Sequence, residues 1–114
     1  VAAPPVAVAQ PSANAKSIIQ FAARCETSDV VLFPELGLSG YTCGDLFAQE
    51  VLLDECLKQI GLLCEANRPS EQLWVLGCPI RMSNQLYNCA VAIADGQVLG
   101  IVPKTYLPTY GEFY

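Results

Sequence analysis

The chain has 114 residues, of which 53% are hydrophobic and only 15% charged, and its formal net charge is −5. Globular domains usually carry about 25% charged residues, so this chain needs more burial than a free-standing domain of its size easily provides. The six basic residues are scattered and form no phosphate-neutralising stripe, which argues against nucleic-acid binding. No apolar run approaches the roughly 18 residues of a membrane span, so no membrane partner is expected.

The cysteines bear on the compartment and on metal binding. Their even number, six, leaves a disulfide framework possible, but five lie in apolar stretches where a free thiol behaves as a small hydrophobe. Histidine and CxxC pairs are both absent, and with them the common zinc spacings. The first residues lack the positive segment and long apolar core of a signal peptide. We therefore expect free thiols, no metal site and a cytoplasmic location.

The first predicted element is a helix that follows a proline-rich loop. It is expected to begin at Pro11, where a missing N–H costs nothing, with Ser12 or Asn14 as a cap, and to end near residues 27–28. One apolar face at helical spacing supports it: Ile18, Phe21, Ala22 and Cys25.

Two apolar runs and a long amphipathic segment come next. Val30–Phe33 is short and continuously apolar, which predicts a strand buried on both faces. Apolar side chains at helical spacing predict a second helix from about Leu46 to Ala66. Leu73–Ile80 predicts a second buried strand, followed by a polar loop at residues 81–85.

A hairpin is predicted near the end of the chain. Two apolar stretches flank Asp95 and Gly96, a dipeptide typical of a tight β-turn. Helix and strand alternate before this hairpin, so the order of elements indicates an α/β fold that gains antiparallel pairing toward its end.

Two charged residues directly follow a predicted strand and a proline. Glu35 comes after Pro34, and Lys104 comes after Pro103. Ligand sites in open α/β sheets lie at the carboxyl ends of strands, so we expect the two side chains within near-contact distance in one pocket, at the ends of neighbouring strands. Glu35 is then a candidate general base, and Lys104 a candidate for holding a developing oxyanion. For each residue, an ordinary surface charge is the alternative.

Glu112 and Cys43 are further candidates. A second carboxylate near Lys104 would keep that lysine charged and let a glutamate act as base, although Glu112 can also be a surface charge. Because the chain has no histidine, it cannot form a Ser–His–Asp triad or a Cys–His dyad. Cys43 is more simply a loop thiol than a nucleophile.

The segments "FPELGLSGY" and "VPKTYLPTYGEFY" resemble motifs of the nitrilase, or carbon–nitrogen hydrolase, superfamily. More closely, "YTCGDLF" and "PKTYLPTYGEFY" are similar to the glutaminase domains of the glutamine-dependent NAD synthetases, and the resemblance covers nearly the whole chain. It implies an α-β-β-α sandwich. Residues 1–114 would form its truncated N-terminal first half, with no complete domain present.

The resemblance also implies roles for individual residues. The family's catalytic set is Glu, Lys and Cys, so Glu35 matches the general base, Lys104 the lysine that stabilises the intermediate, and Glu112 the second carboxylate near it. Tyr41 and Tyr110 are the expected walls of the substrate pocket. The family's nucleophilic cysteine follows a strand downstream of the lysine, and none of the six cysteines here matches its motif. We therefore expect these residues to lack the nucleophile and to be inactive alone.

The implied reaction is attack of that cysteine on the side-chain amide of glutamine, which releases ammonia and then glutamate. A separate synthetase domain would use the ammonia, with ATP and magnesium, to convert deamido-NAD to NAD in a homo-oligomeric parent. No cofactor is expected within this chain, which has no GxxxxGK[ST] phosphate loop. Two alternatives stay open: another amidase or carbamoylase of the superfamily that acts on a small amide, or a non-catalytic fragment.

Overall fold

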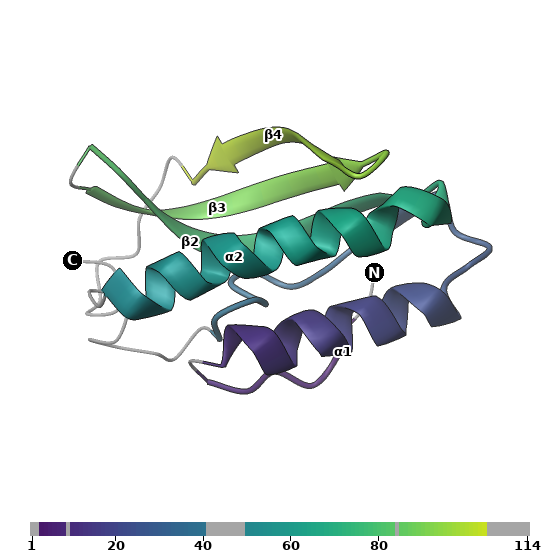
Figure 1. Ribbon diagram of the computed structural model, residues 1–114, viewed down its shortest axis with the longest axis horizontal. Helices are drawn as coiled ribbons and strands as arrows, with labels where there is room; N and C mark the ends of the chain where they lie inside the picture. Colours follow the sequence, from purple (N-terminus) through teal and green to yellow (C-terminus); the bar gives the residue numbers. More distant parts are fainter. Residues whose placement is uncertain (1–2, 9, 41–49, 84, 105–114) are drawn as a thin grey trace.

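The computed structural model describes residues 3–8, 10–40, 50–83 and 85–104. Within these residues, two long helices lie against a four-stranded sheet of strand order β1-β2-β3-β4 (Figure 1). Helix α1 (Pro11–Arg24) packs beside α2 (Glu50–Asn67), and α2 contacts β2, β3 and β4. A short 3-10 turn, η2 (Arg68–Ser70), leads from α2 into the sheet.

Three of the four strands run in the same direction. β1 (Val30–Leu32) pairs in parallel with β2 (Leu73–Met82), which pairs antiparallel with β3 (Gln85–Ala94). β3 then pairs antiparallel with β4 (Gln97–Pro103), so β1, β2 and β4 are co-directional. The predicted α/β fold with a terminal hairpin is therefore confirmed.

The turn of that hairpin follows from its two residues. Asp95 and Gly96 both have positive φ, 53° and 73°, which is the backbone that a tight two-residue turn requires. The Gly96 N–H donates to Oδ1 of the buried Asn67 at 3.1 Å, which ties the turn to the end of α2. Asn67 also donates to the Gln72 carbonyl at 3.0 Å, so one side chain joins α2, the turn and the start of β2.

Helix α1 differs from its prediction at both ends. It begins at Pro11 as expected, but no side chain caps it, so the prediction of a Ser12 or Asn14 cap was wrong. Asn14 is buried instead and bonds to the backbone of Ala7 and of Leu38. The helix ends at Arg24, short of residues 27–28, because the Cys25 N–H bonds to Ala22 in a tightened last turn.

The bounds of β2, β3 and α2 also differ from the predicted ones. The polar loop predicted at residues 81–85 is shorter than expected, because the pairs Arg81–Leu86 and Met82–Gln85 extend the β2–β3 ladder into it. Backbone pairing does not depend on side-chain polarity at a solvent-exposed hairpin tip. The predicted second helix corresponds to α2, while residues 46–49 lie outside the described residues.

The core lies on one face of the sheet. Alternate strand residues face the helices and are buried, among them Val31, Trp74, Leu76, Cys78, Val91 and Ile93. The other face, here called the open face, leaves Val30 53% exposed and Leu32 44% exposed. β1 is therefore not buried on both faces as predicted, because among the described residues the helices cover only one side.

The segment after β1 crosses the open face directly over Gly77. A Cβ on Gly77 would meet the backbone N of Leu36 and lie 2.8 Å from the Pro34 carbonyl oxygen. The Leu38 N–H donates to the Gly77 carbonyl at 3.1 Å, and Asn14 Nδ2 donates to the Leu38 carbonyl at 2.8 Å. Because only a glycine leaves this space, Gly77 allows Glu35 to reach across β2.

Several described cysteines lie in the core, where burial raises the pKa of a thiol. Cys25, Cys56, Cys64, Cys78 and Cys89 are free thiols, and Cys43 lies outside the described residues. The neighbouring Cys56 thiol, together with burial, raises the pKa of Cys78 well above its usual value. Burial likewise raises the pKa of the Cys89 and Cys64 thiols.

We expect Gly77→Ala to destabilise the protein by about 1–3 kcal/mol, because the added methyl overlaps the Pro34–Leu36 backbone. Gly61→Ala is the matched control, since a Cβ there meets nothing within 4 Å and alanine favours the helix by about 1 kcal/mol. Thermal unfolding of the two variants measures the difference. An unchanged midpoint for Gly77→Ala would contradict the close approach.

We also expect Cys78 to be alkylated at least about tenfold more slowly than the half-buried Cys25 in the native protein, because a raised pKa and burial both reduce the reactive thiolate. Mass spectrometry of peptides after timed iodoacetamide treatment gives each rate. Any disulfide-linked peptide among these cysteines, in a sample protected from oxidation, would refute the expectation of free thiols.

Candidate functional site

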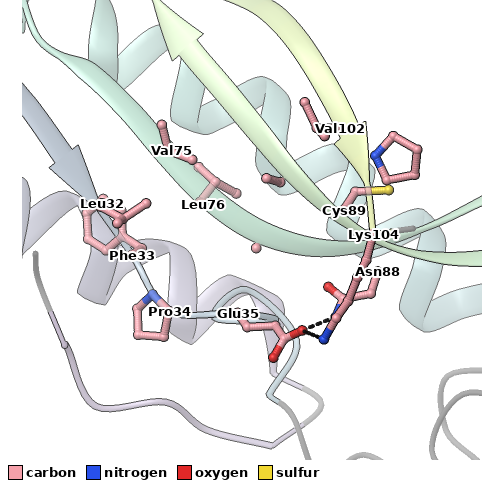
Figure 2. A pocket seen from close by; sticks show the side chains of 13 residues that line it. Leu32, Phe33, Pro34, Glu35, Val75, Leu76, Asn88, Cys89, Val102 and Lys104 are labelled. Carbon is pink, nitrogen blue, oxygen red and sulfur yellow. Dashed lines mark hydrogen bonds and ion pairs between the residues drawn. The ribbon is translucent and has the colours of Figure 1, made fainter. Parts of the chain in front are cut away.

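A pocket of about 330 Å³ lies on the open face, where β1 and β4 end (Figure 2). Its walls come from the end of β1 and the following turn, and from short stretches of the other three strands. The lining residues fall in the ranges 32–35, 75–77, 88–90 and 102–104. Most of these side chains are apolar, and the charged groups among them meet at one end of the pocket.

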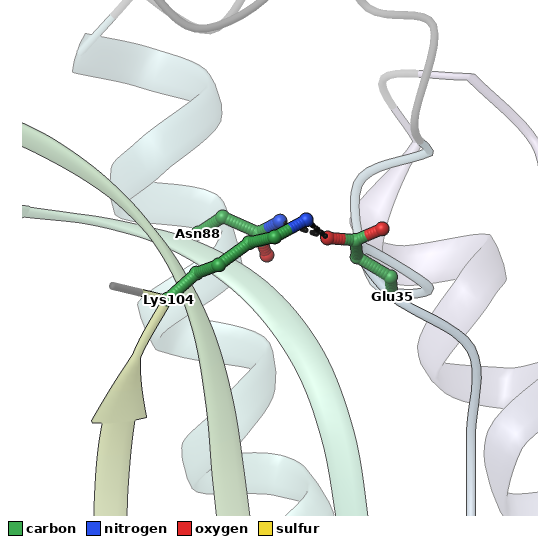
Figure 3. Close-up of polar contacts among 3 residues, drawn as sticks. All are labelled: Glu35, Asn88 and Lys104. Atoms are coloured by element: carbon green, nitrogen blue, oxygen red, sulfur yellow. Dashed lines mark hydrogen bonds and ion pairs between the residues drawn. The ribbon is translucent and has the colours of Figure 1, made fainter. Parts of the chain in front are cut away.

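Glu35 and Lys104 form an ion pair at that end. Lys104 Nζ lies 2.7 Å from Glu35 Oε1 (Figure 3), and the two side chains are 38% and 42% exposed, respectively. The prediction that they share a pocket at near-contact distance is confirmed. An ion pair this exposed contributes little to stability, so its interest lies in its chemistry.

The two strands that carry this pair are not neighbours, and that part of the prediction was wrong. β1 and β4 are the outer strands of the four, with β2 and β3 between them. The side chains meet because the turn after β1 runs across β2 over Gly77, toward the end of β4. Leu36, directly after Glu35, has a φ of 52°, a left-handed conformation that bends the chain at this point.

Asn88 of β3 completes the arrangement, and its role was not predicted from the sequence. Its Nδ2 donates to the same Oε1 of Glu35 at 2.5 Å, and its backbone carbonyl accepts from the Lys104 N–H at 2.8 Å. Asn88 is 4% exposed. An amide among the apolar residues of a strand was the available signal, because a buried polar side chain needs a partner.

The arrangement leaves one carboxylate oxygen available for chemistry. Glu35 Oε1 accepts two hydrogen bonds, whereas Oε2 accepts none from the described residues. Such a carboxylate can take a proton from a group in the pocket, and the neighbouring ammonium can donate to an oxygen that gains negative charge.

Tyr41, Cys43, Tyr110 and Glu112 lie outside the described residues. Within the described ranges, no group of three or more His, Cys, Asp or Glu side chains is arranged to hold a metal ion. No described helix is both long enough and apolar enough to span a bilayer.

Comparison with known sequences identifies the family to which this chain is similar. Residues 2–113 match the carbon–nitrogen hydrolase family. Over 109 residues the chain is 42% identical to the glutamine-dependent NAD(+) synthetase of Mycobacterium tuberculosis (strain ATCC 25618 / H37Rv), and this alignment covers 94% of the chain but only 16% of that relative.

Solved structures agree with the sequence match. The glutamine-dependent NAD+ synthetase from Acinetobacter baumannii superposes with a TM-score of 0.83 at 30% identity, covering 95% of this chain and 20% of that one. An amidase from Nesterenkonia sp. gives a TM-score of 0.78 at 23% identity, covering 96% and 44%. A variant of that amidase shows covalent addition of the acetamide moiety of fluoroacetamide at its active site cysteine. On its fold and its sequence, this chain belongs to the carbon–nitrogen hydrolase family.

Proposed function

We propose that this chain is the N-terminal part of a glutamine-hydrolysing domain that supplies ammonia for the synthesis of NAD. The observation that supports this proposal most directly is the contact between Glu35 and Lys104 at the pocket. The two residues stand at the positions where the family's base and lysine are expected. The 42% identity to a glutamine-dependent NAD(+) synthetase supports glutamine as the amide.

In this proposal Glu35 acts through Oε2, which accepts no hydrogen bond from the described residues. Oε2 takes the proton of a cysteine thiol, and the thiolate attacks the side-chain amide carbon of glutamine. Lys104 donates to the oxyanion of the tetrahedral intermediate. Glu35 returns the proton to the leaving nitrogen, so that ammonia departs and a thioester remains. A water molecule, deprotonated by Glu35, then attacks the thioester and releases glutamate. Glu35 returns this proton to the departing cysteine sulfur, which restores the free thiol.

The nucleophile and the ammonia acceptor are proposed to lie outside these 114 residues. The cysteine modified in the Nesterenkonia amidase variant supports a cysteine nucleophile in this family. Glu112 would be a second carboxylate near Lys104, and Tyr41 and Tyr110 would line the pocket. A synthetase domain would bind ATP and Mg²⁺ and amidate deamido-NAD, in a homo-oligomeric protein of the cytoplasm.

A second candidate is hydrolysis of a small aliphatic amide. The fold similarity to the Nesterenkonia amidase favours it, because this chain covers 44% of that shorter protein. The pocket, with its apolar walls and one charged end, offers no described feature that excludes such a substrate. Measuring NAD formation with glutamine and with an ammonium salt, beside hydrolysis of a small amide, distinguishes the two activities.

We expect Glu35→Gln in the full-length protein to reduce glutamine-dependent NAD formation by about 10²–10⁴-fold, because glutamine keeps the shape of the side chain and loses its basicity. NAD formation from an ammonium salt should persist, since free ammonia bypasses the glutaminase step. The assay follows NAD formation from deamido-NAD and ATP with each nitrogen source.

Glu50→Gln is the matched control. Glu50 is an exposed glutamate in an ion pair with Arg81 at 3.3 Å, outside the pocket lining, and both rates should survive its replacement. If both rates collapse together in Glu35→Gln, the residue is structural. If the wild-type protein makes no NAD from either source but hydrolyses a small amide, the second candidate is correct.

We expect a polypeptide of residues 1–114 alone to show no glutaminase activity and to self-associate. The proposed nucleophile is absent from it, and the open face presents exposed apolar side chains such as Val30 and Val102. Glutamate release and light scattering test the two parts. An active monomer would instead make Cys43 a serious candidate for the nucleophile.

A further inference from the structure

We propose that Asn88 is a positioning residue, which orients the Glu35 carboxylate so that Oε2, and not Oε1, acts as the base. This inference rests on the proposed function, in which Glu35 transfers protons. Asn88 lines the pocket, and in this proposal it acts on the reacting atoms through Glu35.

The contacts of Asn88 reach both charged residues. Its side-chain amide donates to Glu35 Oε1 (Figure 3). Its backbone carbonyl accepts from the backbone N–H of Lys104. One residue of a central strand therefore fixes the carboxylate and the point from which the lysine side chain leaves the sheet. A substitution at this position removes the side-chain contact to Glu35 and keeps the backbone contact to Lys104.

Burial makes Asn88 the more rigid of the two donors. Lys104 has a long flexible stem and is 38% exposed, so alone it leaves the carboxylate free to rotate. Asn88 is 4% exposed, and it lies within a paired strand opposite Pro79. Its amide holds Oε1 toward the sheet, which directs Oε2 away from these two donors.

Two donors on one oxygen also decide where a proton is accepted. Hydrogen bonds to Oε1 stabilise negative charge there and occupy its lone pairs, so an incoming proton is accepted at Oε2. Among the described residues, the titratable groups lining the pocket are Glu35, Lys104 and the Cys89 thiol. Burial raises the pKa of Cys89, so this thiol stays neutral near pH 7.

A purely structural role is the competing explanation, and the chain offers a matched control for it. Asn67 is also fully buried and holds backbone groups through its side chain, donating to Gln72 and accepting from Gly96. It lies outside the pocket lining. Replacing Asn67 perturbs a buried amide without touching Glu35.

The experiment compares Asn88→Ser, Asn88→Asp and Asn67→Asp in the full-length protein. Glutamine-dependent and ammonia-dependent NAD formation are measured across pH 5–9, and kcat and KM for glutamine are determined separately. We expect both Asn88 variants to lose about 10–100-fold in glutamine-dependent kcat, the size expected for losing a hydrogen bond to a charged group, with KM and the ammonia-dependent rate retained.

The pH profile gives the readout that a structural role would not move. Asn88→Ser removes a hydrogen bond that favours the ionised carboxylate, so the acidic limb of the glutamine-dependent rate should move to higher pH. Asn88→Asp should move it further, by about one pH unit or more, because two adjacent carboxyl groups hold a shared proton more tightly. Asn67→Asp should leave the limb in place.

Three results would overturn the proposal. One is an acidic limb that stays in place in both Asn88 variants. Another is an equal movement of the limb in Asn67→Asp. The third is loss of the ammonia-dependent rate in both Asn88 variants, which would mark Asn88 as a residue needed for folding. A wild-type protein without glutamine-dependent activity is a separate result, because it refutes the proposed function itself.

Discussion

The site depends on the close approach of one backbone segment to one glycine. The turn after β1 lies against Gly77 so closely that a single Cβ would collide with the Leu36 nitrogen. This contact carries Glu35 across β2 to β3 and the end of β4. Asn14 of α1 holds the far side of the turn through the Leu38 carbonyl, so helix packing also contributes to the position of the carboxylate.

Backbone strain at the same turn fits a functional role. Leu36 has a positive φ, which is costly for a residue with a branched side chain, and it is fully buried. Burial of the Leu36 side chain and the Leu38–Gly77 hydrogen bond offset that cost. The strained conformation persists because the surrounding packing fixes it, and its result is a carboxylate pointed at a buried amide and an ammonium.

The two faces of the sheet explain the unusual composition. Helices α1 and α2 bury one face, while apolar side chains on the open face and along β4 remain exposed, including Val30, Leu32, Val98, Ile101 and Val102. These exposed apolar side chains account for part of the high hydrophobic content. The pocket lies on this same open face, and so does the carboxylate assigned to chemistry.

Sequence alone determined the local features, because helical periodicity, apolar runs and a turn dipeptide depend on neighbouring residues. It predicted α1, α2, the hairpin at Asp95–Gly96 and the two charged residues that follow Pro34 and Pro103. It did not predict that β1 and β4 are the outer strands, because strand order is set by contacts between distant segments.

Only the tertiary structure decided how Glu35 and Lys104 meet across two intervening strands, and that Asn88 joins them. Those facts depend on the space above Gly77 and on the register of β3, in which Asn88 lies opposite Pro79 and beside the end of β4. A linear pattern shows which residues carry charge and which are apolar. Which of them share an oxygen atom is fixed only when the strands pair and the turn packs over the glycine.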